Sequence, residues 1–333
     1  MSDSPAYGCI TQVPGLLAGH WTSPQRPTGC SVVIAPQGAV AAVDVRGAAP
    51  GTRETDLLAP GHLVDKVHAV MLGGGSAWGL DAASGVVRWL EQQGIGMDVG
   101  FGHPLPLVPA AVLFDLPVGD ARIRPDADGG FAACAAAGNS LLACGNVGAG
   151  AGATVGKLFG SDHAMKGGIG SASVQLQGVT VGALVACNAV GDVLDPHTGQ
   201  LLAGARTAAD TLTLRDTQRA LLQGDAPRFA LPGTNTTIGI IATDAALSRT
   251  ELQRLTVAGH DGLARCIRPV HTMLDGDTLF ALSTGQTSRQ PDLITLSAMA
   301  AEAVQLAVLC AVRAAQTLRV GDLWLPAASE RQA

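Results

Sequence analysis

Residues 233–241 read GTNTTIGII, and this segment organises the rest of the chain. Two adjacent threonines, Thr236 and Thr237, open a run of β-branched residues directly after a polar region. This pattern predicts a strand that emerges from a loop, with a hydroxyl group at its first position. A hydroxyl group in that place can serve as a nucleophile, although ordinary strand threonines give the same pattern.

Thr236 would gain its own base if the bond between Asn235 and Thr236 were cut. The released α-amine would have a pKa of about 7.7 to 8 and could accept the hydroxyl proton at neutral pH. The same hydroxyl group can make the cut: it attacks the Asn235 carbonyl, forms an ester by an N-to-O acyl shift, and water hydrolyses the ester. Thr236 is therefore a candidate nucleophile, and the 235–236 bond is a candidate site of autocleavage.

A second polar element, DGDTLFAL at residues 275–282, stands at the start of a later apolar run. Asp275 and Asp277 are two residues apart, so both side chains would project toward one face of an extended segment. Paired carboxylates can orient a nucleophile and hold an ammonium group. The same composition is also common in exposed turns, and the residues alone leave both interpretations open.

Together with GGGSAWGL at residues 73–80, these two segments resemble the L-aminopeptidase/D-esterase family of self-processing N-terminal-nucleophile hydrolases. That family includes β-peptidyl aminopeptidases and nylon-oligomer hydrolases, and the threonine and aspartate spacing is most similar to the nylon-oligomer branch. The resemblance extends from about Gly15 to Thr317. It implies a single domain over residues 1–333 that is cut into fragments 1–235 and 236–333.

The fold class follows from two arguments. Hairpins mixed with long flanking helices favour a layered α+β sandwich over a doubly wound parallel sheet. The family resemblance implies a four-layer αββα sandwich, similar to the N-terminal nucleophile hydrolases but connected differently.

The resemblance also implies a catalytic set of Thr236, Asn188, Lys157, Asp275 and Asp277. Thr236 would attack the substrate, Asn188 would stabilise the oxyanion, and Lys157 would help to activate the hydroxyl group or polarise the intermediate. The aspartates would orient Thr236 and hold its ammonium group, or bind the substrate amine. Without the resemblance, Lys157 could equally be an exposed lysine, and asparagines such as Asn188 are common in turns.

Four further residues are expected to bind substrate: Gly75, Ser76, Trp78 and Phe114. Gly75 and Ser76 belong to a glycine-rich turn that is either close backbone packing or one wall of the substrate pocket. Many family members carry a tyrosine, thought to assist the oxyanion or the substrate, where this chain has Phe114. The only tyrosine in the chain is Tyr7, so that phenol is missing here.

Two glycine-rich stretches suggest nucleotide loops, but neither fits. At residues 73–80, Trp78 stands where a dinucleotide loop needs its third glycine. At residues 145–158, Ala151 replaces the first glycine of a P-loop, and Leu158 replaces the residue that binds magnesium. Nucleotide binding is therefore not expected.

Composition limits the partners of the protein. Hydrophobic residues make up 47% of the chain and charged residues 14%, which predicts a homo-oligomer, by the family resemblance a tetramer of processed heterodimers. A net charge of −6 without a basic cluster disfavours nucleic-acid binding. The seven cysteines form no C-x-x-C pair, so we expect no metal, no cofactor and no disulfide framework.

The expected cellular location rests on the cysteines, the N-terminal residues and the longest apolar run. Scattered free cysteines are typical of a reducing compartment, and residues 1–5 lack the features of a signal peptide. The longest apolar run, residues 293–312, is interrupted by Glu302 and Gln305, so it is better interpreted as a buried helix than as a membrane span. We expect a cytoplasmic protein without a membrane partner.

The remaining pattern predicts the following elements: a hairpin of strands 31–35 and 39–45, a strand 67–72 and helix 77–93, a strand 107–116 and helix 129–144, a hairpin 168–177 and 179–187, a polar linker 195–233 that could be mobile, a strand 237–242 and helix 248–267, and a strand 278–283 and helix 292–318. Asp44 and Arg46 are expected to form an ion pair or a turn. His271 is interpreted as a strand-edge histidine rather than as part of a Ser/His/Asp triad.

These inferences predict a hydrolase of short peptides, amino-acid amides or esters, or ω-amino-acid oligomers, with an N-terminal threonine nucleophile. An acyltransferase of the ornithine acetyltransferase type, which also self-cleaves before a threonine, is an alternative. A non-processing oligomeric scaffold is another.

Overall fold

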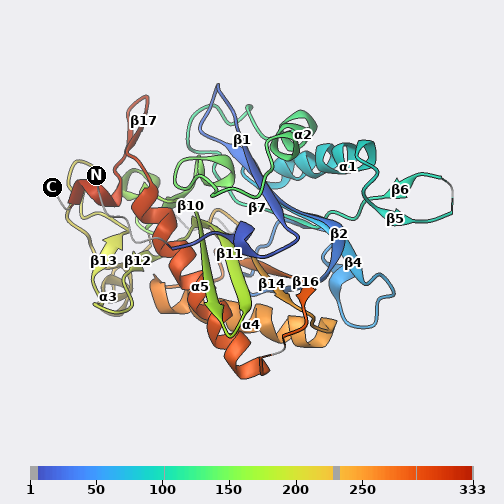
Figure 1. Cartoon of the computed structure of the whole chain (residues 1–333). Helices are drawn as coiled ribbons and strands as arrows, with labels where there is room; N and C mark the ends of the chain where they lie inside the picture. Colours follow the sequence, from blue (N-terminus) through green and yellow to red (C-terminus); the bar gives the residue numbers. More distant parts are fainter. Residues whose placement is uncertain (1–6, 101, 228–232, 290, 332–333) are drawn as a thin grey trace.

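The computed structural model describes residues 7–100, 102–227, 233–289 and 291–331. At its centre is a nine-stranded mixed sheet in the order β10-β11-β14-β16-β2-β4-β7-β3, with β1 also paired to β2 (Figure 1). Its strands are β1 (Leu17–Thr22), β2 (Gly29–Val45), β3 (Thr52–Arg53), β4 (Lys66–Gly73), β7 (Ala110–Val112), β10 (Gly168–Leu176), β11 (Val179–Asn188), β14 (Thr236–Ala245) and β16 (Thr278–Thr287).

The helices and smaller sheets surround this sheet. The α-helices are α1 (Ala82–Gln92), α2 (Ala127–Ala135), α3 (Thr217–Leu222), α4 (Arg249–Cys266) and α5 (Leu293–Ala314). The short strands pair as β5 (Met97–Asp98) with β6 (Pro104–Leu105), β8 (Thr154–Val155) with β9 (Met165–Lys166), β12 (Asp192–Leu194) with both β13 (Leu201–Ala203) and β15 (Ile267–Arg268), and β17 (Leu318–Val320) with β18 (Leu323–Leu325).

The long strand β2 belongs to both halves of the central sheet. Residues 30–34 pair with β4, and residues 40–45 pair with β16. Between Ile34 and Ala39 the register on β4 shifts, and Gly38 adopts a left-handed φ of 71°. A bulge of this kind bends a strand. The predicted hairpin around residues 36–38 is therefore wrong, because Pro-Gln-Gly interrupts one strand instead of reversing the chain.

Alternate residues of the strands divide the interior into three cores. Ile241 on β14 packs toward α4 and α5, whereas its neighbour Ile240 faces the space between the two half-sheets. On β4, Leu72 faces that same inner space and Met71 packs toward α1 and α2. Two helix layers thus enclose two sheet layers, and the predicted four-layer αββα sandwich is confirmed.

The starts that the sequence predicts for helices α4 and α5 are confirmed. Ser248 caps α4 in a reciprocal capping box with Glu251, and the Asp292 carboxylate accepts the Thr295 N–H at the start of α5. Helix α5 is long and apolar enough to pass for a membrane span by length and composition alone. It packs instead against α4, β10 and β11, as expected of a core helix.

Several predicted boundaries are wrong. The helix expected at 77–93 begins as a 3₁₀ turn, Ser76–Asp81, before α1, and the helix expected at 129–144 is the shorter α2. Only Ala110–Val112 of the expected strand 107–116 pairs in the sheet, and α5 ends before residue 318 because β17 starts there.

The segment predicted as a mobile linker is largely built into the fold. Residues 195–227 contribute β13 and α3, and the fully buried Arg206 side chain donates to the carbonyl groups of Asp162, Ala164 and Ala209. Residues 228–232 of that expected linker, and residues 1–5 considered for a signal peptide, lie outside the described residues.

The seven cysteines are free thiols, of which five are buried and Cys144 and Cys310 are partly exposed. The prediction of free cysteines is confirmed, and most of them behave as small core residues. The expected ion pair between Arg46 and Asp44 is also present, at 2.9 Å.

Candidate active site

Thr236 and Asn188 lie opposite each other where β14 begins and its antiparallel neighbour β11 ends. Thr236 is the first residue of β14, and its partner in the register is Asn188, the last residue of β11. The residues two positions into each strand, Ile238 and Ala186, belong to the inner core, so the Thr236 and Asn188 side chains lie on the inner face. Both side chains are buried.

The Asn235–Thr236 peptide bond is surrounded by hydrogen-bond donors. The Asn235 carbonyl oxygen accepts the Gly276 N–H at 2.9 Å and also the hydroxyl group of Thr236. Gly276 permits this approach because a Cβ there would lie 2.6 Å from the Ala49 carbonyl oxygen and 3.0 Å from Thr236 Oγ1. The geometry places a hydroxyl group and a backbone N–H on the carbonyl oxygen of the same peptide bond.

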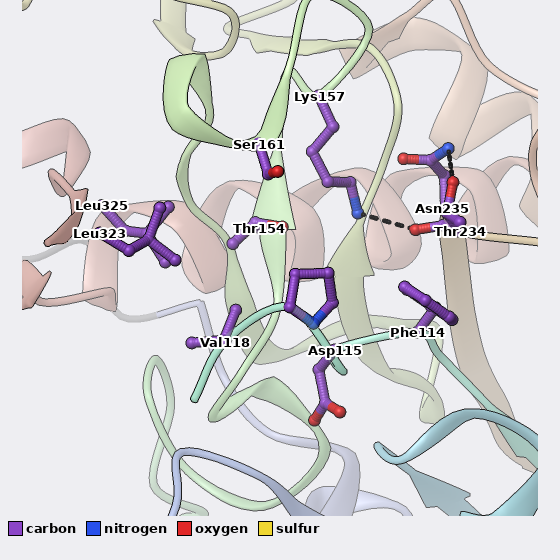
Figure 2. Close-up of a pocket in the computed structure, with 11 residues that line it drawn as sticks. Phe114, Asp115, Val118, Thr154, Lys157, Ser161, Thr234, Asn235, Leu323 and Leu325 are labelled. Atoms are coloured by element: carbon purple, nitrogen blue, oxygen red, sulfur yellow. Dashed lines mark hydrogen bonds between the residues drawn. The ribbon is translucent and has the colours of Figure 1, made fainter. Parts of the chain in front are cut away.

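Lys157 reaches this junction from the glycine-rich loop. Its Nζ lies 2.9 Å from the Asn188 carbonyl oxygen and 2.8 Å from Asn188 Oδ1. It also lies 3.4 Å from the Thr234 carbonyl oxygen, a contact that Figure 2 shows. Burial lowers the pKa of Lys157 to about 7, although nearby carboxylates, Asp275 first, oppose that shift. A substantial fraction of this amine is therefore neutral near pH 7, and the alternative of an exposed, flexible lysine is wrong.

The two predicted aspartates lie in the turn before β16, and their carboxylates point to different partners. Asp277 Oδ1 accepts the Thr237 N–H at 2.6 Å. Asp275 Oδ2 accepts the backbone N–H and the hydroxyl group of Thr272, at 2.9 and 2.6 Å. Burial, together with the charge of Asp277, raises the pKa of Asp275 to about 6. The expectation that both project from one strand face is wrong, since β16 begins only at Thr278.

His271 is a member of this site that the sequence argument set aside. Its Nδ1 lies 2.8 Å from Asp277 Oδ2 in the same turn. The preceding Pro269 and Val270 suggested a strand edge, and no local pattern predicts the chain reversal that brings His271 back onto Asp277.

A cavity of about 50 Å³ lies beside the junction. Figure 2 shows Lys157, Thr234 and Asn235 on one side of it, and Leu323 and Leu325 of β18 on the other. The full lining is Phe114, Asp115, Pro117, Val118, Thr154, Lys157, Ser161, Thr234, Asn235, Leu323 and Leu325. The cavity therefore joins a polar wall next to the 235–236 junction to an apolar wall.

Asp115 is the second residue that the sequence argument missed. It follows Phe114 at the end of a buried segment, and its carboxylate accepts from Arg26 at 2.9 Å, from the Thr28 hydroxyl at 2.6 Å and from the Gly75 N–H at 2.9 Å. With these partners Asp115 anchors the glycine-rich turn at residues 73–76. This favours close backbone packing for that turn.

Of the four residues expected to bind substrate, only Phe114 lines the cavity. Gly75 and Ser76 are not among its lining residues, and the Trp78 side chain is 60% exposed beneath the Arg124 guanidinium group. A substrate-binding role for these three remains a prediction.

The arrangement suits attack of a hydroxyl group on an amide or ester carbonyl, with a base and oxyanion donors close by. Within the described ranges, no group of three or more His, Cys, Asp or Glu side chains could hold a metal ion.

Solved structures share this fold. A β-aminopeptidase from Burkholderia sp. has a TM-score of 0.70 and 21% identity, over 96% of this chain and 90% of that one. The L-aminopeptidase D-Ala-esterase/amidase from Ochrobactrum anthropi, described as a variant of the Ntn hydrolase fold, has a TM-score of 0.71 and 20% identity, over 96% and 91%.

Other relatives, found by sequence, have a higher sequence identity to this chain than these two solved structures. An uncharacterised aminopeptidase of Mycobacterium tuberculosis is 47% identical over 323 residues, covering 93% of this chain and 90% of the relative. A 6-aminohexanoate-oligomer endohydrolase of Paenarthrobacter ureafaciens is 34% identical over 276 residues, covering 82% and 74%. The sequence model of peptidase family S58 matches residues 8–322. The family resemblance is thus confirmed: the chain belongs to peptidase family S58 and is a hydrolase.

Proposed function

We propose that this protein is a self-processing aminopeptidase or amidase in which Thr236 is the nucleophile. The observation that carries the proposal is the Asn235–Thr236 junction, where the Thr236 hydroxyl and the Gly276 N–H both contact the Asn235 carbonyl oxygen. This one peptide bond combines the nucleophile, its target and an oxyanion donor.

Processing would proceed by an N-to-O acyl shift. Thr236 Oγ1 attacks the carbonyl carbon of Asn235, and its proton passes to a base, for which the neutral form of Lys157 is available. The C–N bond then breaks, the nitrogen takes up a proton, and the acyl group rests on Oγ1 as an ester. Water hydrolyses that ester, which leaves a carboxylate on Asn235 and a free amine on Thr236.

Turnover would use the same atoms with an external substrate. The Thr236 amine accepts the hydroxyl proton, Oγ1 attacks the substrate carbonyl, and the leaving amine or alcohol departs with a proton. Water then hydrolyses the acyl-enzyme. Asn188 uses one amide N–H on the Phe114 carbonyl, at 3.2 Å, and has a second for the oxyanion. Asp277 and Asp275 hold the ammonium form of Thr236.

The substrates we propose are short peptides, amino-acid amides or esters, and ω-amino-acid oligomers. The apolar wall formed by Val118, Leu323 and Leu325 suits an acyl group with a small or unbranched hydrocarbon part. The names of the relatives, aminopeptidase and 6-aminohexanoate-oligomer endohydrolase, fit the same range. We further propose a cytoplasmic homo-oligomer, a tetramer of processed heterodimers, on the basis of composition and free cysteines.

Intact mass under denaturing conditions tests the proposal. We expect two fragments, the smaller one beginning at Thr236. Thr236→Ala should give one uncut chain without hydrolytic activity, whereas the matched control Thr237→Val, which preserves side-chain shape, should be cut and active. A Thr236→Ala protein that still hydrolysed substrate would overturn the assignment. Offering an amine acceptor in competition with water separates a hydrolase from the alternative acyltransferase.

A further inference from the structure

His271 makes two contacts with one oxygen of the Asp277 carboxylate. Its Nδ1 lies 2.8 Å from Asp277 Oδ2, and its backbone N–H donates to the same oxygen at 3.1 Å. The other oxygen, Oδ1, accepts the Thr237 N–H at 2.6 Å. The carboxylate therefore bridges the turn and the first residues of β14, one residue from Thr236.

The backbone of His271 is in an unfavourable conformation that makes this double contact possible. Its φ is +55°, in the left-handed region that few residues other than glycine adopt, although asparagine, aspartate and histidine do so more often than the rest. Strained residues of this kind are frequent at functional sites.

The surroundings of the ring identify which nitrogen carries the proton. The Asp277 carboxylate is an acceptor for Nδ1, whereas the buried Nε2 has no hydrogen-bond partner. On its other side the ring meets the edge of His260, with ring centroids 4.8 Å apart, and the Nε2–H of His260 donates to the Asp44 carbonyl. Burial lowers the pKa of His260 to about 4, so His260 is neutral.

We propose that His271 is a positioning residue for the Thr236 reaction. Its Nδ1–H orients Asp277, so that the carboxylate stays beside the amine that processing creates on Thr236. The inference rests on the proposed function and deepens it, because it assigns to the aspartate a fixed orientation that backbone contacts alone would not maintain. Loss of the Nδ1–H would leave Oδ2 with only the longer contact to the His271 backbone N–H, at 3.1 Å, while the Thr237 N–H still binds Oδ1, so the carboxylate would be held less tightly.

Two substitutions isolate this hydrogen bond from the backbone strain. Asparagine and glycine both tolerate the left-handed conformation, but only asparagine places an N–H near the position of Nδ1. In the processed enzyme, with active sites counted by acyl-enzyme burst, His271→Asn should keep most of the wild-type kcat. His271→Gly should lose about 10- to 100-fold in kcat with little change in KM, since a small misplacement of a catalytic group has effects of this size. Equal kcat values for the two variants would overturn the proposal.

A measurement on the unaltered protein guards against variants that fold poorly. In protein labelled with ¹⁵N-histidine, long-range ¹H–¹⁵N correlation should show a protonated Nδ1 and an unprotonated Nε2 for His271. His163, whose Nδ1 lies 2.9 Å from the Arg206 carbonyl oxygen, should give a second protonated Nδ1, and His271→Asn should remove only the His271 signal. An unprotonated Nδ1 on His271 would overturn the inference. Activity in Thr236→Ala would instead overturn the proposed function, so the two failures are distinguishable.

Discussion

Two lysines on neighbouring segments, the partly buried Lys157 and the fully buried Lys166, differ in a way that their pKa values alone do not reveal. Burial lowers the pKa of each to about 7, and the charge of Asp115 opposes the shift in both. The Lys166 ammonium donates to three main-chain carbonyl groups, of Gly150, Ala153 and Gly167, at 2.8, 2.8 and 3.2 Å. Lys157 contacts Asn188 and the residue before Asn235.

The contrast shows that a lowered pKa reports burial, while contacts report the role. Lys166 gives a second donor to the Gly150 and Ala153 carbonyl groups of the glycine-rich loop, each of which also accepts a backbone N–H. That loop ends at Thr154, whose N–H donates to Asn188 Oδ1 at 3.0 Å. Lys166 therefore supports the site from one step away, whereas Lys157 lies within it.

The largest expected effect separates the two lysines by activity. Lys157→Met should lower kcat by about 10²- to 10⁴-fold, because it removes the amine that we expect to help the Thr236 amine activate the hydroxyl group or to polarise the intermediate. Lys166→Met should leave kcat per active site within about tenfold, since its contacts are structural. Both are measured on processed protein after active-site titration. A larger loss of kcat in Lys166→Met than in Lys157→Met would contradict the distinction.

A second substitution alters the surroundings of Lys157 without changing the lysine. Asn188→Asp would place a carboxylate at the 2.8 Å contact with Nζ, which stabilises the ammonium form and raises the pKa of Lys157 above about 7. The acid limb of the pH–rate profile should move to higher pH. At pH 7 kcat should fall about 10²- to 10³-fold, since an oxyanion donor is also lost.

The control for Asn188→Asp is Thr154→Val, which keeps the Thr154 N–H on Asn188 Oδ1 but removes the hydroxyl group. Its acid limb should stay where it is in the wild type. If the acid limb of the pH–rate profile did not move in Asn188→Asp, the titration of Lys157 would not be the cause of that limb.

The smallest expected effect is one that the two lysines share. Both titrate near pH 10.5 when unfolded and about 7 when folded, so between these pH values the unfolded chain holds more protons. The destabilisation caused by burying each lysine is thus fully present below about pH 7 and is relieved as pH rises toward 10.5.

Urea unfolding at pH 7 and pH 9 measures this trend. The free energy of unfolding of the wild type minus that of Lys166→Met should be greater at pH 9 than at pH 7. The difference between the wild type and Lys157→Met should change in the same direction. If the difference between wild type and variant did not change with pH, burial would not lower the pKa of that lysine.

Local chemistry in the sequence predicted much of the fold. The hairpin of β10 and β11 and the caps of α4 and α5 depend on residues close together in the chain, and these predictions are confirmed. The prediction around residues 36–38 failed because a glycine with positive φ can serve a turn or a bulge equally well, and pairing with β4 and β16 decides between them.

The residues of the candidate site likewise fall into those that the sequence predicted and those that only the structure revealed. Thr236 and the two aspartates were candidates from local sequence, Asn188 and Lys157 only through the family resemblance, and the structure brings all five around one peptide bond. Asp115 and His271 carried no such signal. Their hydrogen bonds to Arg26 and Asp277 depend on chain reversals that no local pattern encodes.

The sequence by itself determined that a threonine hydroxyl opens a buried strand, because β-branched residues follow it and a polar segment precedes it. Only the tertiary structure decided which polar groups meet that hydroxyl. Lys157, Asn188 and Gly276 come from separate segments, and they converge because β11, β14 and β16 are neighbours in the central sheet and the Lys157 side chain extends to the end of β11. The lowered pKa of Lys157 has the same origin, since desolvation is a property of the packed layers and not of neighbours along the chain.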